Sequence, residues 1–209
     1  MPDGENAAPS EAEERGTLFA FDFSQPVEPL VIADGVCVRA GEELLNRIEH
    51  AMHASGEYPP GEPKRRWRRG RIPYVVLVGS EVVSYGWTTP EPEPMDDLGV
   101  SFTAPPGEVW LYDFATVPEF RGRRLYPALL RFILKQLKDQ DVSRTWIGTS
   151  PGNIASQRGI SRAGFTLVCE TEFVGRPGQG HFVIYPTAGV PEELVHVAVK
   201  TVHGRLADD

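Results

Sequence analysis

A cluster of arginines follows the most apolar segment of the chain and could bind an anion. The segment EVWLYDFATV, at 108–117, runs into PEFRGRRLYPALL, which carries Arg121, Arg123 and Arg124 ahead of an amphipathic stretch. A strand that feeds a helix through a tight loop presents unpaired backbone N–H groups and the positive end of the helix dipole. The arginines add formal charge at the same point. The pattern predicts a site for a phosphate or pyrophosphate over the residues Arg121, Gly122, Arg123, Arg124, Leu125 and Tyr126.

A second polar motif, NIASQRGISRAG at 153–164, predicts a short capped helix. Asn153 is a preferred N-cap residue, and Gly164 is a preferred residue just beyond a helix C-terminus. Ser156 follows the cap by three residues. Taken alone, these residues indicate helix capping.

Three titratable side chains are candidates for acid–base chemistry. Asp113 interrupts an otherwise apolar strand, where burial would disfavour its charge and make it a stronger base. Asp113 could instead accept hydrogen bonds from the backbone or from an arginine. Glu108 begins the same strand and His181 begins the last one, and both are weaker candidates. We expect no metal site.

The segment KRRWRRGR, at 64–71, is strongly basic and surrounds Trp67. It could be a solvated loop before a strand. It could also dock an anion, such as cofactor phosphates or an acidic substrate, with Trp67 as a stacking face. RNA binding has no supporting module elsewhere in the sequence.

The elements that would position these residues alternate between strands and helices. Strands are expected over 30–40 (a pair or a bulged strand), 108–117, 144–150, 165–175 and 181–186, and a hairpin over 72–89 turns at Gly79 and Ser80. Helices are expected over 41–54, from Pro127 to about residue 140, and over 153–164. The segment 90–107 is expected to be a loop, 17–27 an extra edge strand, and the tail a short helix or strand. The fold class is therefore a mixed α/β sheet, in one domain of about seven strands and about four helices.

Composition narrows the class of protein. The chain has 209 residues, of which 41% are hydrophobic, and a net charge of −8, which argues against a general nucleic-acid binder. No apolar stretch approaches the roughly 18–20 residues that span a bilayer, so no membrane association is expected. Residues 1–16 are expected to form a disordered acidic leader, with a domain over 17–209. Two cysteines make no disulfide framework, and a cytoplasmic location is the default expectation.

The two motifs VPEFRGRRLYPALL and NIASQRGISRAGF, in this order, resemble those of the GNAT family, the Gcn5-related N-acetyltransferases. The resemblance covers about 108–165, and the preceding strands fit the family's early elements. It implies that acetyl-CoA binds at the basic loop and that Asn153 and Ser156 lie along the pantetheine arm. It also implies that a backbone N–H near Ala115, Thr116 and Val117 stabilises the tetrahedral oxyanion.

The chain departs from the family pattern at three positions. The family loop has glycine where this chain has Arg124, and glycine or alanine where it has Tyr126. Many members carry a tyrosine, the general acid toward the CoA thiolate, at the position of Ile160. We expect the cradle to be retained if the Tyr126 ring turns away from the cofactor. Tyr126, Tyr185 and Ser156 are unranked candidates for the missing proton donor.

The resemblance implies an N-acetyltransferase that moves an acetyl group from acetyl-CoA to a primary amine by direct attack in a ternary complex. The acceptor would be a small molecule, an amino acid or a peptide terminus. Two alternatives stay open: transfer of a longer acyl chain from CoA or an acyl carrier protein, and a non-catalytic module that binds CoA or a partner. The sequence does not decide between a monomer and a homodimer.

Overall fold

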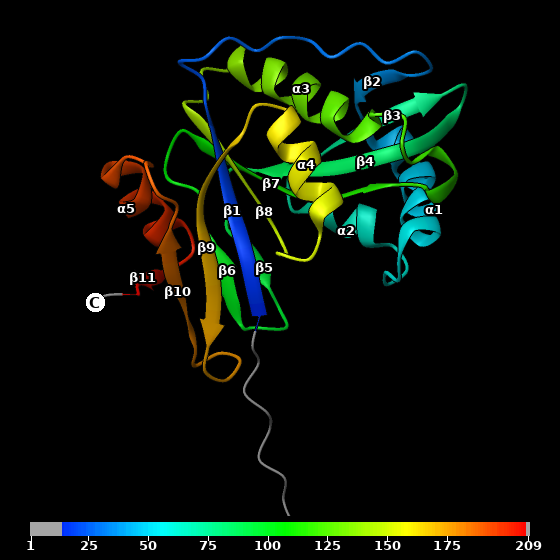
Figure 1. Ribbon diagram of the computed structural model, residues 1–209. Helices are drawn as coiled ribbons and strands as arrows, with labels where there is room; N and C mark the ends of the chain where they lie inside the picture. Colours follow the sequence, from blue (N-terminus) through cyan, green and yellow to red (C-terminus); the bar gives the residue numbers. More distant parts are fainter. Residues whose placement is uncertain (1–13, 208–209) are drawn as a thin grey trace, which may run out of the picture.

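A nine-stranded mixed sheet forms the centre of the computed structural model, which describes residues 14–207 (Figure 1). Its strand order is β11-β10-β9-β1-β8-β7-β4-β3-β2. The strands are β1 (Glu14–Asp22), β2 (Val36–Arg39), β3 (Ile72–Val78), β4 (Glu81–Thr89), β7 (Glu108–Thr116), β8 (Arg144–Thr149), β9 (Thr166–Val174), β10 (His181–Pro186) and β11 (Gly204–Leu206). A separate hairpin consists of β5 (Glu93–Met95) and β6 (Val100–Phe102). Pairs β7–β8 and β10–β11 are parallel, and the other pairs of the large sheet are antiparallel.

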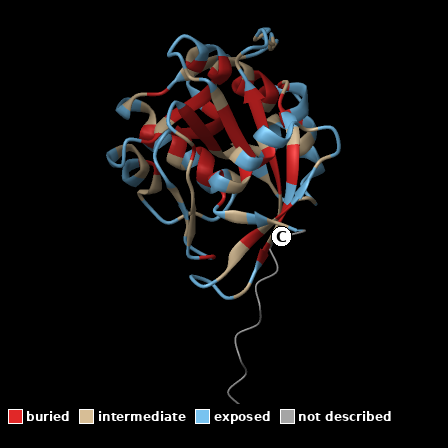
Figure 2. Ribbon diagram, turned by 90° about the vertical axis from the view of Figure 1, so that its left-hand side faces the viewer, coloured by how far each residue is buried: buried red, intermediate tan, exposed pale blue. Residues whose placement is uncertain are grey.

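Helices cover both faces of the sheet, so β7, whose consecutive residues point to opposite faces, is packed on both sides. Val109 and Leu111 join the core beneath α3 and α4, whereas Trp110 joins the core on the opposite face. The α-helices are α1 (Leu45–Ser55), α2 (Glu62–Arg68), α3 (Leu125–Lys138), α4 (Ile154–Arg162) and α5 (Glu192–Thr201), with short 3-10 turns η1 (Glu42–Leu44) and η2 (Pro118–Phe120). Figure 2 shows the buried strands at the centre of the molecule. The predicted mixed α/β class is confirmed, with more strands and helices than expected in the described residues.

Several predicted elements are confirmed at the level of single residues. The 72–89 hairpin turns at Gly79 and Ser80, and its two strands pair antiparallel. The oxygen Oδ1 of Asn153 accepts the backbone N–H of Ser156 at 3.1 Å, as an N-cap should. Gly164, just beyond α4, has φ +98°, a conformation that glycine adopts without steric cost.

Other expectations about the elements were wrong. The segment 17–27 contributes not an edge strand but β1, which lies inside the sheet between β8 and β9. The segment 30–40 forms only β2, and the segment 90–107 contains the β5–β6 hairpin. The tail, expected to add a short helix or strand, forms one of each, α5 and β11. Helix α3 begins at Leu125, two residues before Pro127. The sheet already includes residues 14–16 of the predicted leader, whose remaining part, 1–13, lies outside the described residues.

The basic segment 64–71 also differs from its predicted loop. Its first residues continue a helix, α2, that begins at Glu62 with Pro63 in the first turn. Proline is well tolerated there because the first N–H groups of a helix have no internal partner. Trp67 packs partly buried against the core between α1 and the sheet. It is therefore a core contact rather than a free stacking face.

Two irregularities of β7 open the centre of the sheet. The parallel pairing with β8 extends only from Glu108 to Leu111, and beyond that point the two strands are not paired. The pairing with β4 shifts register where Gly86 faces Asp113 and Phe114. A Cβ on Gly86 would lie 2.0 Å from the Phe114 ring, so only glycine fits under that ring. Asp113 has φ +51°, and the bulge turns its side chain toward α2 rather than toward the face of Leu111.

Candidate active site

A groove lined by arginines lies between the end of β7, the start of α3 and α4. It encloses a cavity of about 610 Å³. Four arginines line this groove and, within the described residues, none of them pairs with a carboxylate: Arg121, Arg124, Arg158 and Arg162. The predicted residues Ala115, Thr116, Gly122, Leu125, Tyr126, Asn153 and Ser156 line it as well. This "arginine groove" has the charge needed to bind a polyphosphate.

The backbone of Arg124 takes the conformation that a glycine would take. Arg124 is the N-cap of α3 with φ +60° and ψ +22°, in the left-handed region. The loop therefore turns into the helix as the glycine of the family pattern would allow, although the residue is an arginine. This backbone conformation leaves the N–H groups at the start of α3 directed toward the groove at the entrance of the helix. The exposed side chain adds a cation at the groove.

Tyr126 occupies space that helix α4 leaves open. A Cβ on Gly159 would lie 2.5 Å from Cδ1 of Tyr126, so the ring rests against the bare backbone of that glycine. Its hydroxyl lies 3.4 Å from Oγ of Ser156, and its ring centroid lies 5.5 Å from that of Phe114. Burial raises the pKa of Tyr126 well above its ordinary value, so the phenol stays protonated. Tyr126 lines the groove without filling it.

Two predicted cofactor residues lie outside the groove lining. The Arg123 guanidinium lies over the Phe120 ring, 4.8 Å from its centroid, and its Nη2 donates to the Glu119 carbonyl at 3.3 Å. The Val117 N–H donates to the Val83 carbonyl at 2.9 Å and is therefore not free to bind a ligand.

A smaller cavity, of about 190 Å³, lies at the gap between β7 and β8, and we call it the channel. It shares Phe114, Tyr126, Asn153 and Ser156 with the groove. On the other face of the sheet it shares Tyr112, Asp113, Gly148 and Thr149 with a second cavity, of about 330 Å³. We call this second cavity the aromatic pocket. Where β7 diverges from β8, the channel thus borders both larger cavities.

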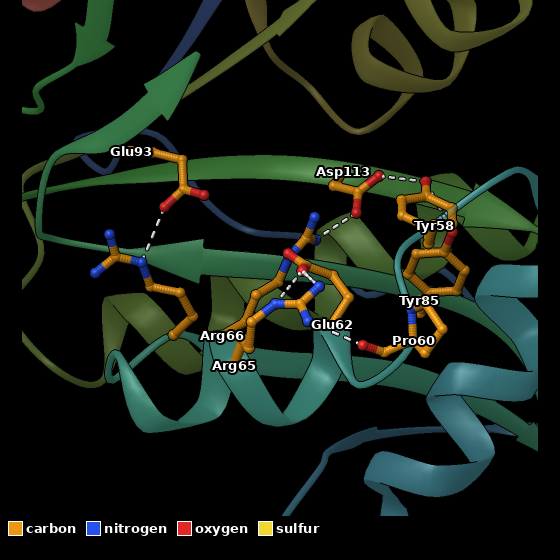
Figure 3. A network of polar contacts seen from close by, with 9 residues as sticks. Tyr58, Pro60, Glu62, Arg65, Arg66, Tyr85, Glu93 and Asp113 are labelled. Carbon is orange, nitrogen blue, oxygen red and sulfur yellow. Dashed lines mark hydrogen bonds and ion pairs between the residues drawn. The ribbon is translucent and has the colours of Figure 1, made fainter. Parts of the chain in front are cut away.

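Asp113 lies in the wall of the aromatic pocket with both carboxylate oxygens engaged (Figure 3). Tyr58 donates its hydroxyl hydrogen to Oδ1 at 2.7 Å, and Arg66 forms an ion pair with Oδ2. Arg66 also pairs with Glu62 at 2.7 Å. These contacts match the second interpretation of Asp113 from the sequence, a carboxylate that accepts an arginine.

Arg66 is held on several sides and serves as the hub of this network. Its guanidinium carbon lies 5.4 Å from the ring centroids of both Trp87 and Tyr112. Burial alone would lower the pKa of Arg66, but the neighbouring Asp113 and Glu62 outweigh burial and raise it. Arg66 is therefore a permanent cation whose charge is already compensated by internal carboxylates. The basic segment was predicted to bind an external anion, whereas its Arg66 binds carboxylates of the protein itself.

Glu93 is a pocket residue that the sequence reasoning missed. It lies on β5 and lines the aromatic pocket, where its Oε2 accepts a hydrogen bond from Nε of Arg71 at 2.9 Å. Burial raises the pKa of Glu93, and the arginine only partly offsets that effect. Tyr112 lies next to this carboxylate. Burial raises the pKa of Tyr112, and the negative charge of Glu93 raises it further. The Tyr112 hydroxyl is buried beside the Glu93 carboxylate.

The other two acid–base candidates lie away from both cavities. Glu108 is at the opposite end of β7, where it pairs with Arg144 at 2.8 Å and accepts the indole N–H of Trp146. His181 begins β10, pairs with Val174 of β9 and lines neither cavity. Neither side chain is brought together with Asp113 or Glu93. Among residues 14–207 there is also no group of three potential metal ligands.

The comparison with family models gives one match, to the Acetyltransferase (GNAT) family, over residues 40–165. This range includes the arginine groove, the channel and Asp113. The chain belongs to the GNAT acetyltransferase family. It is therefore an acyltransferase, as the two sequence motifs implied. No curated protein matches the sequence.

Solved structures of other GNAT proteins share the fold at low sequence identity. A GNAT acetyltransferase from Novosphingobium aromaticivorans is 16% identical, with TM-score 0.56, over 82% of this chain and 69% of its own. One from Colwellia psychrerythraea is also 16% identical, with TM-score 0.52, over 76% of this chain but only about half, 54%, of its own. The aminoglycoside acetyltransferase AAC(6')-Iy, in complex with a CoA-containing bisubstrate analogue, is 13% identical, with TM-score 0.52, over 64% of this chain and 92% of its own.

In this GNAT domain the position that often carries the family's tyrosine is structural. Ile160 is fully buried in the core between α3, α4 and the sheet. Of the remaining donor candidates, Tyr185 is exposed on β10 and binds Glu172, far along the sheet from the channel. Tyr126 and Ser156 both line the channel.

Within the part of the chain that is described, no helix is long and apolar enough to span a bilayer.

Proposed function

We propose that this GNAT domain transfers an acetyl group from acetyl-CoA to the primary amine of a small molecule by direct attack in a ternary complex. The observation that carries the proposal is the pair of cavities that the channel borders at the gap between β7 and β8. The arginine groove would hold the phosphates and pantetheine, and the channel would hold the thioester. The aromatic pocket would hold the amine on the opposite face of the sheet.

Arg121, Arg124 and Arg158 would bind the phosphates of CoA, together with the N–H groups at the start of α3. Each guanidinium can form charge-assisted hydrogen bonds with phosphate oxygens. Asn153 and Ser156, at the start of α4, would border the pantetheine arm. The bound cofactor contributes an activated thioester, and every other contribution to the reaction comes from protein side chains and backbone.

Glu93 is the general base in this proposal. A carboxylate whose pKa is raised by burial is better matched to an ammonium than an ordinary one. Glu93 accepts a proton from the ammonium, directly or through one water, and the neutral amine attacks the thioester carbon. Asp113 is a positioning residue, because its oxygens are occupied by Tyr58 and Arg66. It holds α2 and the bulge of β7 together at the mouth of the channel.

A backbone N–H of β7 would stabilise the tetrahedral oxyanion. Successive N–H groups of a strand point to opposite edges, and Val117 N–H points to β4. The N–H of Thr116 therefore faces the edge where β7 leaves β8. When the C–S bond breaks, the sulfur leaves as a thiolate, which its pKa near 8.5 allows, and the Tyr126 hydroxyl can donate a hydrogen bond to it, while the nitrogen loses its remaining proton to water. One oxyanion donor of this kind contributes about 3 kcal/mol to transition-state stabilisation.

The carrier-protein alternative loses part of its support, since three of the six cations of the basic segment pair with carboxylates of the protein, whereas Lys64, Arg68 and Arg69 have no such partner in the described residues. In that alternative the basic segment binds the acidic carrier protein. However, Arg66 and Arg71 already form internal ion pairs with Asp113 and Glu93. Arg65 also pairs with Glu62 at the surface. We therefore favour acyl transfer from CoA itself.

Titration calorimetry with acetyl-CoA tests the proposal. The wild type is compared with the double variant Arg124→Glu, Arg158→Glu and with the control Arg123→Glu, whose side chain lies outside the groove lining. Loss of two charge-assisted hydrogen bonds, each about 1.5–3 kcal/mol, should weaken binding by at least about 100-fold in the double variant. The control should bind like the wild type. A wild type that binds no acetyl-CoA, or a double variant that binds it equally well, would overturn the proposal.

A further inference from the structure

The basic segment ends in a turn that fixes the position of Arg71 between α2 and β3. The Gly70 N–H donates to the Trp67 carbonyl at 2.9 Å, and Gly70 has φ +76°. The Arg71 N–H donates to the Arg66 carbonyl at 3.0 Å. These two hydrogen bonds form the Schellman motif, which closes the end of a helix around a glycine in the left-handed conformation. The backbone of Arg71 is therefore tied to the last turn of α2.

The guanidinium of Arg71 is held by three hydrogen bonds, one from each of its nitrogens. Nε donates to Oε2 of Glu93 at 2.9 Å, and Nη2 donates to the Pro92 carbonyl at 2.6 Å. Nη1 donates to the Arg69 carbonyl at 3.1 Å. Because Pro92 and Glu93 are consecutive residues, Arg71 binds both the carboxylate and the backbone that carries it. A planar group with three fixed donors allows the carboxylate one orientation.

Arg71 lies behind the carboxylate and not in the pocket. The Arg71 side chain is 8% exposed and does not line the aromatic pocket, whereas the Glu93 side chain is 16% exposed and lines it. A small molecule in the pocket can therefore reach Glu93 but not the guanidinium. The hydrogen bond from Arg71 uses Oε2 and does not block Oε1. Any effect of Arg71 on a bound amine must therefore act through Glu93.

The ionisation of Glu93 depends on a small set of neighbours. Within residues 14–207, the charged or titratable side chains that act on this carboxylate are Arg71, Arg66 of α2 and Tyr112 of β7. Burial raises the pKa of Glu93, and the positive charge of Arg71, followed by that of Arg66, lowers it. Arg66 forms its own ion pair with Asp113. Arg71 is therefore the cation that chiefly opposes the effect of burial.

We propose that Arg71 is the positioning residue of the general base: it fixes the Glu93 carboxylate at the pocket wall and keeps it in the charged form that accepts a proton. The inference rests on the proposed acetyl transfer and names the group on which its base depends. An opposite charge within roughly 4–6 Å lowers the pKa of a carboxyl group by about 1–3 pH units. Without Arg71, Glu93 would take up its proton at a higher pH, and the base would be lost at pH values where the wild type works.

The first test follows the Glu93 carboxyl by carbon-13 NMR through a pH titration, with Glu93→Gln to assign its signal. Arg71→Met keeps an apolar stem and removes the charge. The control is Arg68→Met, whose side chain is exposed and has no carboxylate partner in the described part of the chain. We expect the midpoint to rise by about one pH unit or more in Arg71→Met and to stay unchanged in the control. Arg71→Lys keeps the charge without the three-way hydrogen bonding and should give a smaller rise, which can be measured even if Arg71→Met does not fold.

The second test separates a positioning role from a purely structural one. In the same variants, kcat/KM for acetylation of n-butylamine and of spermidine is measured against pH, and calorimetry gives the Kd of acetyl-CoA. Below the midpoint, Arg71→Met should lose about tenfold in kcat/KM for each pH unit that the carboxyl midpoint rises, with the Kd of acetyl-CoA unchanged.

The possible failures separate this inference from the proposed function. If the Glu93 midpoint is the same in the wild type and in both Arg71 variants, Arg71 does not control the base and the inference is wrong. If the midpoint rises and the pH profile of kcat/KM does not follow it, Arg71 has only a structural role, and acetyl transfer itself stands. If the wild type binds no acetyl-CoA, the inference and the proposed function are both overturned.

Discussion

Replacement of Arg124 by glycine should raise stability and lower cofactor affinity at once. Arg124 caps α3 with φ +60°, where an L-residue is strained by roughly 1–2 kcal/mol. Glycine removes that strain but adds entropy to the unfolded chain, about 0.4–1 kcal/mol. The difference leaves a net stabilisation of about 0.5–1 kcal/mol. For a domain of this size, such a change raises Tm by about 1–4 °C.

The affinity effect has the opposite sign because the side chain lines the arginine groove. Within residues 14–207 the guanidinium of Arg124 has no carboxylate partner, so it is available to a phosphate. One charge-assisted hydrogen bond contributes about 1.5–3 kcal/mol. Its loss should raise the Kd for acetyl-CoA between about tenfold and a hundredfold. The backbone path into α3 stays the same, so binding should weaken rather than disappear.

Two further variants separate the backbone effect from the side-chain effect. Arg124→Ala removes the guanidinium but keeps the strain, so it should lose affinity without a gain in Tm. Asp141→Gly relieves a similar backbone, with φ +58°, at the loop after α3, so it should raise Tm without changing affinity. Scanning calorimetry gives Tm and titration calorimetry gives Kd. If Arg124→Gly lowers Tm, or if Arg124→Ala binds acetyl-CoA like the wild type, the assignment of Arg124 is wrong.

Three more predictions concern the network and the Tyr126 contact. The variant Glu93→Gln should abolish the rise of kcat/KM with pH. Burial raises the pKa of Glu93, and a general base acts only once it is deprotonated. If the variant keeps the rise of kcat/KM with pH, Glu93 is not the base. Burial raises the pKa of Glu62, but hydrogen bonds led by that from Arg66 lower it below its ordinary 4.5. Its stabilising effect is thus fully present above pH 4.5 and is lost as pH falls through the lowered pKa. Glu62→Gln should therefore lower Tm more at pH 7 than at pH 3, and equal losses at both pH values contradict this. Gly159→Ala should cost about 1–3 kcal/mol in urea unfolding because its Cβ would lie 2.5 Å from the Tyr126 ring, and Tyr126→Ala should recover most of that cost if the contact is its cause.

Residues whose role depends on local chemistry were predicted well. Asn153 caps α4 because a side-chain oxygen three residues before an N–H satisfies that donor, whatever the rest of the fold. Gly164 ends the same helix because only glycine adopts φ +98° freely. The turn at Gly79 and Ser80 follows from the same kind of local rule. These signals lie within a few residues of the structure that they determine.

Residues whose role depends on distant partners were missed or misinterpreted. Glu93 sits in a proline-rich acidic segment, and nothing near it in the sequence indicates that it pairs with Arg71, twenty-two residues earlier. The inward turn of Asp113 depends on a bulge opposite Gly86, on a different strand. The only sequence signal for Glu93 was its position between two prolines in a segment that joins two strands. The same pattern is equally typical of a solvated loop.

The departures from the family pattern become a single coupled change once the structure is considered. Tyr126 could not replace a small residue unless α4 made room, and Gly159 makes that room by lacking a Cβ. Ile160, the next residue, is then free to fill the core, because a phenol already lines the channel from α3. Arg124 keeps the glycine-like backbone and so leaves the entry to α3 unchanged. A hydroxyl on α3 thus lines a groove that stays open, which supports the proposed cofactor site.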